Sequence, residues 1–209
     1  MIDHLVYATT DLEATVAELA SRLGVEPTPG GSHAGRGTRN QLVGLGAGAY
    51  LEIIGPDDEQ PDPVDGRPFG IDRLVRPRLV GWCVRPRLPL AAVARAAAAA
   101  RWDVGPIQAM SRTRPDGVEL SWHLTMPIIG PTAVAPLPFL IDWGTSPHPA
   151  DTLDHPVQLL DLRIECTAPE ALAGQLEAID ELTSVELIDA PVVRLSALLD
   201  TPGGPLGLS

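Results

Sequence analysis

The sequence contains no lysine: its 15 basic residues are all arginines, and they stand against 27 acidic residues for a formal net charge of -12. Asparagine occurs once, as Asn40. A chain this acidic lacks the positive field that attracts nucleic acids and anionic membranes, so we expect neither as its main partner. No apolar run approaches the ~20 residues that a membrane-spanning helix needs.

Cysteine is also scarce. Cys83 and Cys166 both lie in apolar, strand-like runs, where two buried thiols are more common than a disulfide or a metal clip. The chain begins MIDHLVYA, which lacks a basic segment and is typical of a strand, so we expect no export signal. Together these features predict a soluble, acidic, cytoplasmic globular protein of 209 residues.

One order of elements repeats along the chain. Residues 2–24 predict a strand, a turn and an amphipathic helix, with a capping pattern at Thr10 and Glu13 and a C-terminal glycine, Gly24. Three strand-like pieces joined by glycine-rich turns follow. This pattern predicts a βαβββ unit over residues 1–56.

The same order recurs over residues 79–144. The segment between the two units, residues 57–78, is acidic and then arginine-rich, which is typical of a solvated linker with a short helical turn. Residues 127–138 are rich in proline and apolar side chains, and we expect them to form a lid or a dimer contact. Residues 145–209 begin a third strand and helix, followed by two strand-like runs, so we expect a truncated βαββ unit.

Four segments within residues 1–165 resemble the glyoxalase-like branch of the vicinal oxygen chelate superfamily. They are DHLVYATTDLEATVAEL, GGSHAGRGTRNQLVGLGAGAYLEII, RPDGVELSWHL and PFLIDWG. This superfamily includes glyoxalase I, extradiol dioxygenases and bleomycin-resistance proteins. The resemblance implies an α+β fold in which paired βαβββ modules form a curled mixed-sheet cup. In the enzymes of the family a divalent metal lies in that cup and is chelated by substrate oxygens.

The family's metal ligands come from the first and last strands of each module. Carried over, these positions fall on His4 and Glu52 in the first module and on Asp142 in the last strand of the second. The fourth position falls on Gly81, which has no ligand atom. The resemblance therefore implies a site for Zn, Fe, Mn, Ni or Mg with three protein ligands and one position missing.

Glu52 is also unusual on physical grounds. It stands between Leu51 and Ile53 in an apolar strand, where a carboxylate is costly unless it is paired or bound to a metal. A pairing with Arg39, Arg112 or His4 across the cup is the alternative to a metal. The sequence leaves both interpretations open.

A second candidate site is the glycine-rich string GGSHAGRGTRN. Such a loop can bind an anionic group through backbone N–H groups, or it can be only a tight turn into a strand. Its polar side chains predict cavity positions for His33, Arg36, Thr38 and Asn40. His33 is the best candidate for a general acid or base, because an imidazole titrates near working pH.

The strand VELSWHLTM is the third candidate. Its alternation puts Glu119 and His123 on one face and Trp122 on the other. We expect the polar face to line the cup, with His123 able to move protons, Glu119 binding a ligand and the Trp122 face packed on the alanine-rich helix. Arg112 is placed to close on an anionic substrate. The glycines of residues 44–48 precede a strand, not a helix, so we expect no nucleotide cofactor.

These patterns predict a protein that binds a small anionic or carbonyl-bearing molecule in the cup. As an enzyme it would carry out metal-assisted isomerisation, lyase chemistry or ring-cleaving dioxygenation. The alternative is a metal-free binding protein that sequesters a drug or metabolite, and a third possibility is a cup filled by its own side chains. Exposed edge strands favour a homodimer.

Overall fold

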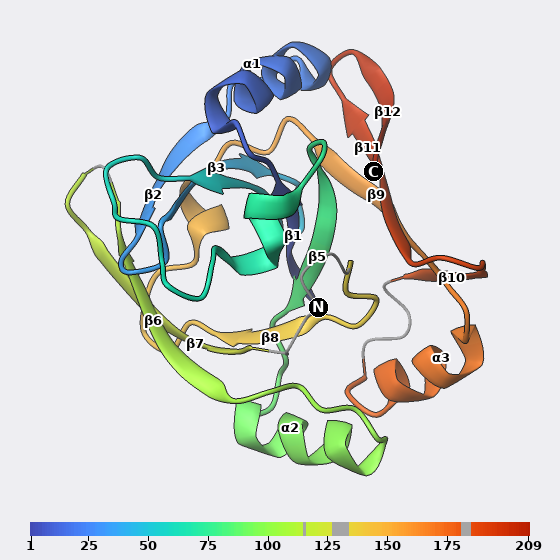
Figure 1. The fold of residues 1–209 in the computed structure, drawn as a ribbon. Coiled ribbons are helices and arrows are strands. Elements are labelled where there is room, and N and C mark those ends of the chain that lie inside the picture. Colours follow the sequence, from blue (N-terminus) through green and yellow to red (C-terminus); the bar gives the residue numbers. More distant parts are fainter. Residues whose placement is uncertain (115, 127–133, 181–184) are drawn as a thin grey trace.

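The computed structural model describes residues 1–114, 116–126, 134–180 and 185–209. Eight strands close into a barrel with the order β1-β4-β3-β2-β6-β7-β8-β5 (Figure 1). Their bounds are Ile2–Ala8 for β1, Thr28–His33 for β2, Thr38–Gly44 for β3, Tyr50–Pro56 for β4, Arg78–Val84 for β5, Ile107–Thr113 for β6, Glu119–Thr125 for β7 and Phe139–Asp142 for β8. The barrel closes where β1 pairs with β5 and where β2 pairs with β6, both antiparallel.

A second sheet lies beside the barrel, with the order β10-β9-β11-β12. Its strands are Gln158–Cys166 for β9, Glu186–Asp189 for β10, Arg194–Thr201 for β11 and Gly204–Leu208 for β12. The helices are Leu12–Leu23 for α1, Leu90–Ala99 for α2 and Pro169–Glu177 for α3, with 3-10 helices Pro68–Arg73 (η1) and Pro149–Thr152 (η2). Three strands follow α3, so the expectation of a truncated unit with two strands is wrong.

Local sequence explains where α1 begins and ends. The cap is Asp11, one residue after the expected Thr10, because its side chain accepts a 3.0 Å hydrogen bond from the backbone N–H of Ala14. The helix ends at Gly24, whose φ of 70° is the left-handed conformation that glycine adopts without strain. Its buried stripe packs the helix onto the outside of the barrel (Figure 1).

Alternation along β1 separates two cores. Leu5 and Tyr7 point out of the barrel into a core shared with the second sheet and the helices. Val6 and Ala8 point inward and contact a smaller apolar cluster inside the barrel. The barrel interior is therefore only partly filled by apolar side chains, which leaves room for a site. No helix in the described part of the chain is long and apolar enough to cross a membrane.

The β2–β6 junction depends on Gly31. Its φ is 139°, and a methyl group there would overlap the carbonyl oxygen of Thr113 on β6. We expect Gly31→Ala to lower the free energy of unfolding by roughly 2–3 kcal/mol, measured by urea denaturation. Gly174→Ala is the matched control: this glycine lies in α3 with open space around it, so alanine should stabilise the chain by about 0.5–1 kcal/mol. Equal effects of the two changes would contradict the role of Gly31.

Candidate functional site

The barrel encloses a cavity of about 910 Å³, within the usual size range of small-molecule sites. Inward-facing side chains of the barrel strands form its walls, and residues 61–70, 72 and 73 cover it. Figure 1 shows this covering segment, which contains η1, running across one end of the barrel. The predicted helical turn of this segment is η1, and most residues of the segment are exposed or half-buried.

Arg67 holds the covering segment in place. Its guanidinium pairs with Asp62 at 2.5 Å and with Asp72 at 2.6 Å, and its Nε donates a 2.8 Å hydrogen bond to the carbonyl of Gly37. These hydrogen bonds with Asp72 and Asp62 raise the pKa of Arg67. Arg67 thus pairs with two acidic residues of its own segment, while the Asp62 side chain remains largely exposed to solvent.

Glu52 is the buried acid of the cavity wall. It lies on β4, which pairs with both β1 and β3 and so brings Glu52 beside residues of those strands. The side-chain amide of Asn40 donates a 2.6 Å hydrogen bond to Glu52 Oε1. His4 Nε2 lies 3.8 Å from Oε2, and His33 Nε2 lies 3.7 Å from Oε1. Two imidazole nitrogens therefore face one carboxylate across a short gap.

The His33 ring is neutral in this arrangement. Burial lowers the pKa of His33, although the nearby Glu52 carboxylate opposes that shift. His33 Nδ1 lies 3.1 Å from Thr38 Oγ1, and Asn40 Nδ2 lies 3.4 Å from His33 Nε2. Since an amide nitrogen only donates, His33 Nε2 is the acceptor and the proton resides on Nδ1. His33 thus presents an unprotonated nitrogen beside Glu52.

A β-bulge in β1 brings Asp3 and His4 together. The pairing of β1 with β5 shifts register between Ile2 and His4, and a bulge of this kind re-aims side chains locally. His4 Nδ1 donates a 2.7 Å hydrogen bond to Asp3 Oδ1. Burial alone would raise the pKa of Asp3, but the hydrogen bonds from His148 and His4 outweigh it and hold the pKa well below its usual value. Asp3 is therefore ionised, and His4 directs Nε2 toward Glu52.

Residues that follow β8 hold Asp3 from its other side. Trp143 Nε1 and His148 Nε2 lie 3.1 Å and 2.9 Å from Asp3 Oδ2 and donate to it. His148 also caps η2, because its Nδ1 accepts a 3.2 Å hydrogen bond from the backbone N–H of Ala150. That bond leaves the proton on His148 Nε2, which is the tautomer that Asp3 requires.

Arg112 supplies a buried positive charge to the same wall. It lies on β6, and its guanidinium donates a hydrogen bond to the carbonyl oxygen of Gly30. Burial lowers the pKa of Arg112, but an arginine keeps its charge in proteins. No carboxylate of the described residues lies within 4.0 Å of this guanidinium. A buried cation without an ion-pair partner favours a ligand with an anionic oxygen.

Seven of the ten predicted site residues line the cavity. They are His4, His33, Arg36, Thr38, Asn40, Glu52 and Arg112. Of the three partners considered for Glu52, the structure brings His4 to it. The glycine-rich string is a hairpin turn between β2 and β3, and two of its N–H groups are already bonded, that of Gly35 to Gln60 and that of Arg36 to His33. These two N–H groups are therefore not free to bind an anion.

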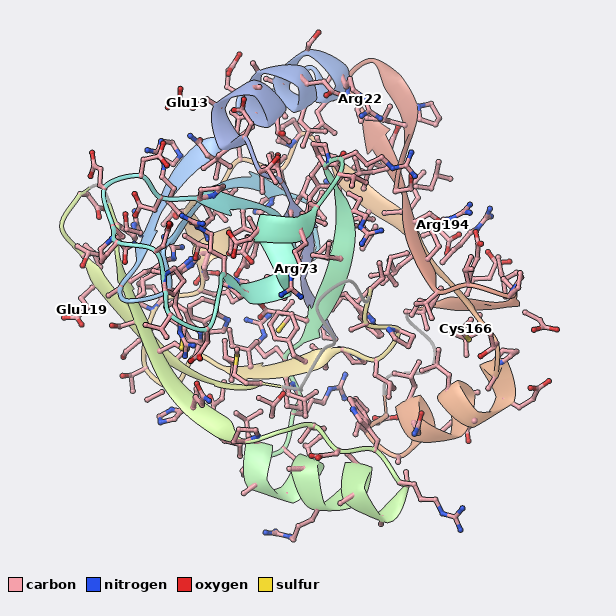
Figure 2. All side chains as sticks on the ribbon, in the orientation of Figure 1. Glu13, Arg22, Arg73, Glu119, Cys166 and Arg194 are labelled. Carbon is pink, nitrogen blue, oxygen red and sulfur yellow. The ribbon has the colours of Figure 1, made fainter. Side chains whose placement is uncertain are left out.

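The other three predicted residues face outward. On β7 the alternation is as predicted but the faces are reversed: Trp122 and Leu124 line the cavity, whereas Glu119 and His123 are exposed. Figure 2 shows Glu119 at the periphery of the molecule. The apolar face points inward, where Trp122 and Leu124 line the cavity together with Phe139 and Ile141 of the neighbouring strand β8. The helix α2 packs elsewhere, in the outer core that includes Leu140.

Asp142 also lies outside the cavity. Phe139 and Ile141 of β8 point inward, so Asp142 is exposed at the strand end, where it accepts a 2.9 Å hydrogen bond from the backbone N–H of Gly144. A Cβ built on Gly81 would lie 3.8 Å and 3.9 Å from the rings of Phe69 and Phe139. The second half of the barrel therefore places aromatic and aliphatic groups where the family pattern requires ligands.

The predicted metal set does not fit this chain, because Asp142 is separated from His4 and Glu52. Among the described residues, one group of three or more potential ligands has its atoms within 4.8 Å of one another: Asp3, His4 and Cys83. Both oxygens of Asp3 are already bonded, and burial raises the pKa of the Cys83 thiol well above its usual value. The group shares only His4 with the set that the family resemblance implies, so it does not reproduce that set.

Sequence reasoning missed Asp3 and His148. Asp3 stands in an apolar strand, like Glu52, and the same reasoning about buried carboxylates would have singled it out. His148 has no local signal in the sequence, because it lies in a proline-containing loop and its partner is 145 positions away. The proline-rich lid predicted at residues 127–138 lies mostly outside the described residues.

Residues 2–179 match the family model described as a glyoxalase-like domain. The chain belongs to the glyoxalase-like family. A hypothetical protein from Staphylococcus aureus shares the fold of this glyoxalase-like chain, with a TM-score of 0.68 at 14% identity over 92% of this chain and 87% of that one. No curated protein is similar enough in sequence to count as a match.

Two methylmalonyl-CoA epimerases resemble the glyoxalase-like chain less closely. The enzyme from Mycobacterium tuberculosis has 17% identity over 67% of this chain and 85% of that one, with a TM-score of 0.42. A Streptomyces coelicolor variant in complex with 2-nitronate-propionyl-CoA has 15% identity over 71% and 98%, with a TM-score of 0.44. Similarity at this level carries no inference about what the present chain binds.

Proposed function

We propose that this glyoxalase-like chain binds a small molecule with a carbonyl and a carboxylate group in the barrel cavity and moves a proton on it. The support is one observation: His4, His33 and Glu52 meet in a cavity whose wall also holds the buried cation Arg112. Acid and base groups beside a fixed positive charge are what enolisation requires.

In the proposed reaction Arg112 binds an anionic oxygen of the substrate. Glu52 takes a proton from the carbon beside the carbonyl group, and the electron pair moves onto the carbonyl oxygen to form an enolate. Return of the proton to carbon restores the carbonyl compound, in the same or the opposite configuration. His4, fixed through Nδ1 by Asp3, and His33, fixed through Nδ1 by Thr38, present unprotonated Nε2 atoms that take the abstracted proton from Glu52 and return it to the substrate carbon. This assigns the chain to isomerase chemistry.

The domain organisation is part of the same proposal. Residues 1–56 and 79–144 are two copies of one βαβββ module, joined by the covering segment 57–78, and residues 145–209 form a further unit. Their identical element order supports a duplication. Residues of both copies line the cavity, and residues 143–148 add the partners of Asp3.

The experiment is deuterium exchange into pyruvate in D2O, followed by loss of its methyl proton signal in NMR. We expect the protein to accelerate exchange above the protein-free rate, and dialysis against a chelator to leave that rate unchanged. Loss of activity after chelation would establish metal assistance instead. An unchanged methyl signal together with a ligand-induced rise in melting temperature would establish the alternative, a metal-free binding protein. Gly81 favours this alternative, because it has no side chain to bind a metal at the family's fourth ligand position. Absence of both effects would overturn the proposal.

A further inference from the structure

The aromatic residues of the chain are concentrated at the cavity. The sequence has four tryptophans, two tyrosines and two phenylalanines. Five of these eight line the cavity: Tyr50, Phe69, Trp122, Phe139 and Trp143. In a protein so poor in aromatic side chains, this placement makes rings the dominant apolar surface that a ligand meets.

These rings form one continuous wall of two ring pairs, which are joined through Tyr50 and the rings of His4 and His148. Trp122 contacts Trp143 with ring centroids 5.1 Å apart, and Phe69 contacts Phe139 at 5.9 Å. Phe139 lies 5.4 Å from the His4 ring, and Trp122 lies 6.4 Å from the His33 ring. The wall therefore begins directly beside the two imidazoles of the proton-transfer cluster.

The polar and the aromatic side chains of the cavity come from different strands. The ionisable side chains His4, His33, Glu52 and Arg112 come from β1, β2, β4 and β6. The aromatic wall comes mainly from β7, β8, the residue after β8 and η1. Gly81 adds no side chain of its own and leaves its space to Phe69 and Phe139. A ligand that satisfies both sides has an anionic, carbonyl-bearing end and a flat apolar end.

We propose that the molecule bound in this cavity is an aryl-substituted 2-oxo carboxylic acid, with its ring on the aromatic wall and its carboxylate at Arg112. This proposal rests on the proposed function for the polar end and adds the ring. A planar ring gains more than an aliphatic group of equal area, because aromatic pairs add edge-to-face and offset-stacked contacts to area burial. The partly buried Met110, also in the cavity lining, provides a sulfur atom for further contact with a ring.

Titration calorimetry with three 2-oxo acids tests the proposal: pyruvate, 4-methyl-2-oxopentanoate and phenylpyruvate. Burial of a phenyl ring predicts that phenylpyruvate binds about 10- to 100-fold more tightly than pyruvate, with the branched aliphatic acid between them. Phe69→Leu should reduce the phenylpyruvate preference at least about threefold. Trp102→Phe, at a tryptophan of the outer core, is the matched control and should leave it unchanged.

The outcomes separate this inference from the function on which it rests. Equal affinity for pyruvate and phenylpyruvate would overturn the aromatic class while leaving proton transfer intact. Binding of phenylpyruvate without exchange would support the class and overturn the reaction. Binding of none of the three acids would overturn both. If Phe69→Leu fails to fold, Met110→Ala makes the same test from β6, where Met110 pairs in register with Trp122 of the wall.

Discussion

Replacing Glu52 by glutamine should lower the rate of deuterium exchange by about 10²- to 10⁴-fold, the usual contribution of a positioned general base. Glutamine has nearly the same shape, and its side-chain oxygen can still accept the hydrogen bond that Asn40 donates. It cannot accept a proton from carbon. The melting temperature should change little, because the substitution removes a buried charge and creates no cavity.

Glu119→Gln is the matched control for this experiment. It makes the same chemical change on the outer face of the barrel, where the side chain is exposed. We expect its exchange rate to equal that of the unmodified protein. A Glu52→Gln variant that is folded and fully active would show that the cluster does not transfer the proton.

Replacing Asp3 by asparagine should lower the free energy of unfolding by about 3–5 kcal/mol, as for other buried ionic groups that lose one partner. The carboxylate accepts hydrogen bonds from His4, His148 and Trp143 and is fully buried. An asparagine can accept at only one of its two terminal atoms. Urea denaturation measures the loss, and Asp161→Asn in the second sheet, where the partner Arg163 is exposed, should cost less than about 1 kcal/mol.

The pH dependence of stability provides a second test of Asp3. Because its pKa is lower in the folded protein than in the unfolded chain, the unfolded chain binds more protons in acid. The stability that Asp3 contributes is therefore complete above its unfolded pKa of about 4 and is lost as pH falls below that value. The variant lacks this contribution, so its stability should decline less on acidification. Parallel curves for the two proteins would contradict the low pKa.

Imidazole nitrogen shifts in NMR distinguish positioning from simple stability. In the unmodified protein the hydrogen bond to Asp3 fixes the proton of His4 on Nδ1. Asp3→Asn should redistribute that proton between the two ring nitrogens, whereas the shifts of His33, held by Thr38, should remain. An unchanged His4 spectrum in the folded variant would show that Asp3 has no role in presenting Nε2.

The sequence predicted the site residues of the first module better than those of the second. Glu52 stood out because a carboxylate in an apolar strand needs a partner, whereas His4 followed from the family resemblance. The periodicity of β7 correctly grouped Glu119 with His123, but alternation shows only which side chains share a face and not which face is inside. That choice depended on the cavity being apolar beside Trp122, which is a property of the closed barrel.

The bulge that joins Asp3 to His4 was beyond prediction for a related reason. A regular strand would place these neighbours on opposite faces, and the register shift arises only from pairing with β5. Likewise, nothing near His148 in the sequence points to a residue 145 positions earlier. Local patterns specify elements, whereas these contacts are specified by how the elements close on one another.

The link between Asp3 and His148 has a consequence for how the protein is made. His4 is the neighbouring donor to Asp3, whereas the donors Trp143 and His148 lie 140 and 145 residues beyond it and join it only after most of the chain has been synthesised. Contacts of such long sequence separation form slowly, because loop closure must precede them. A nascent chain that ends before residue 143 has neither of these distant donors. The full set of hydrogen bonds to Asp3 is therefore a late product of folding, and partly folded chains are expected to lack it even where β1 has already paired.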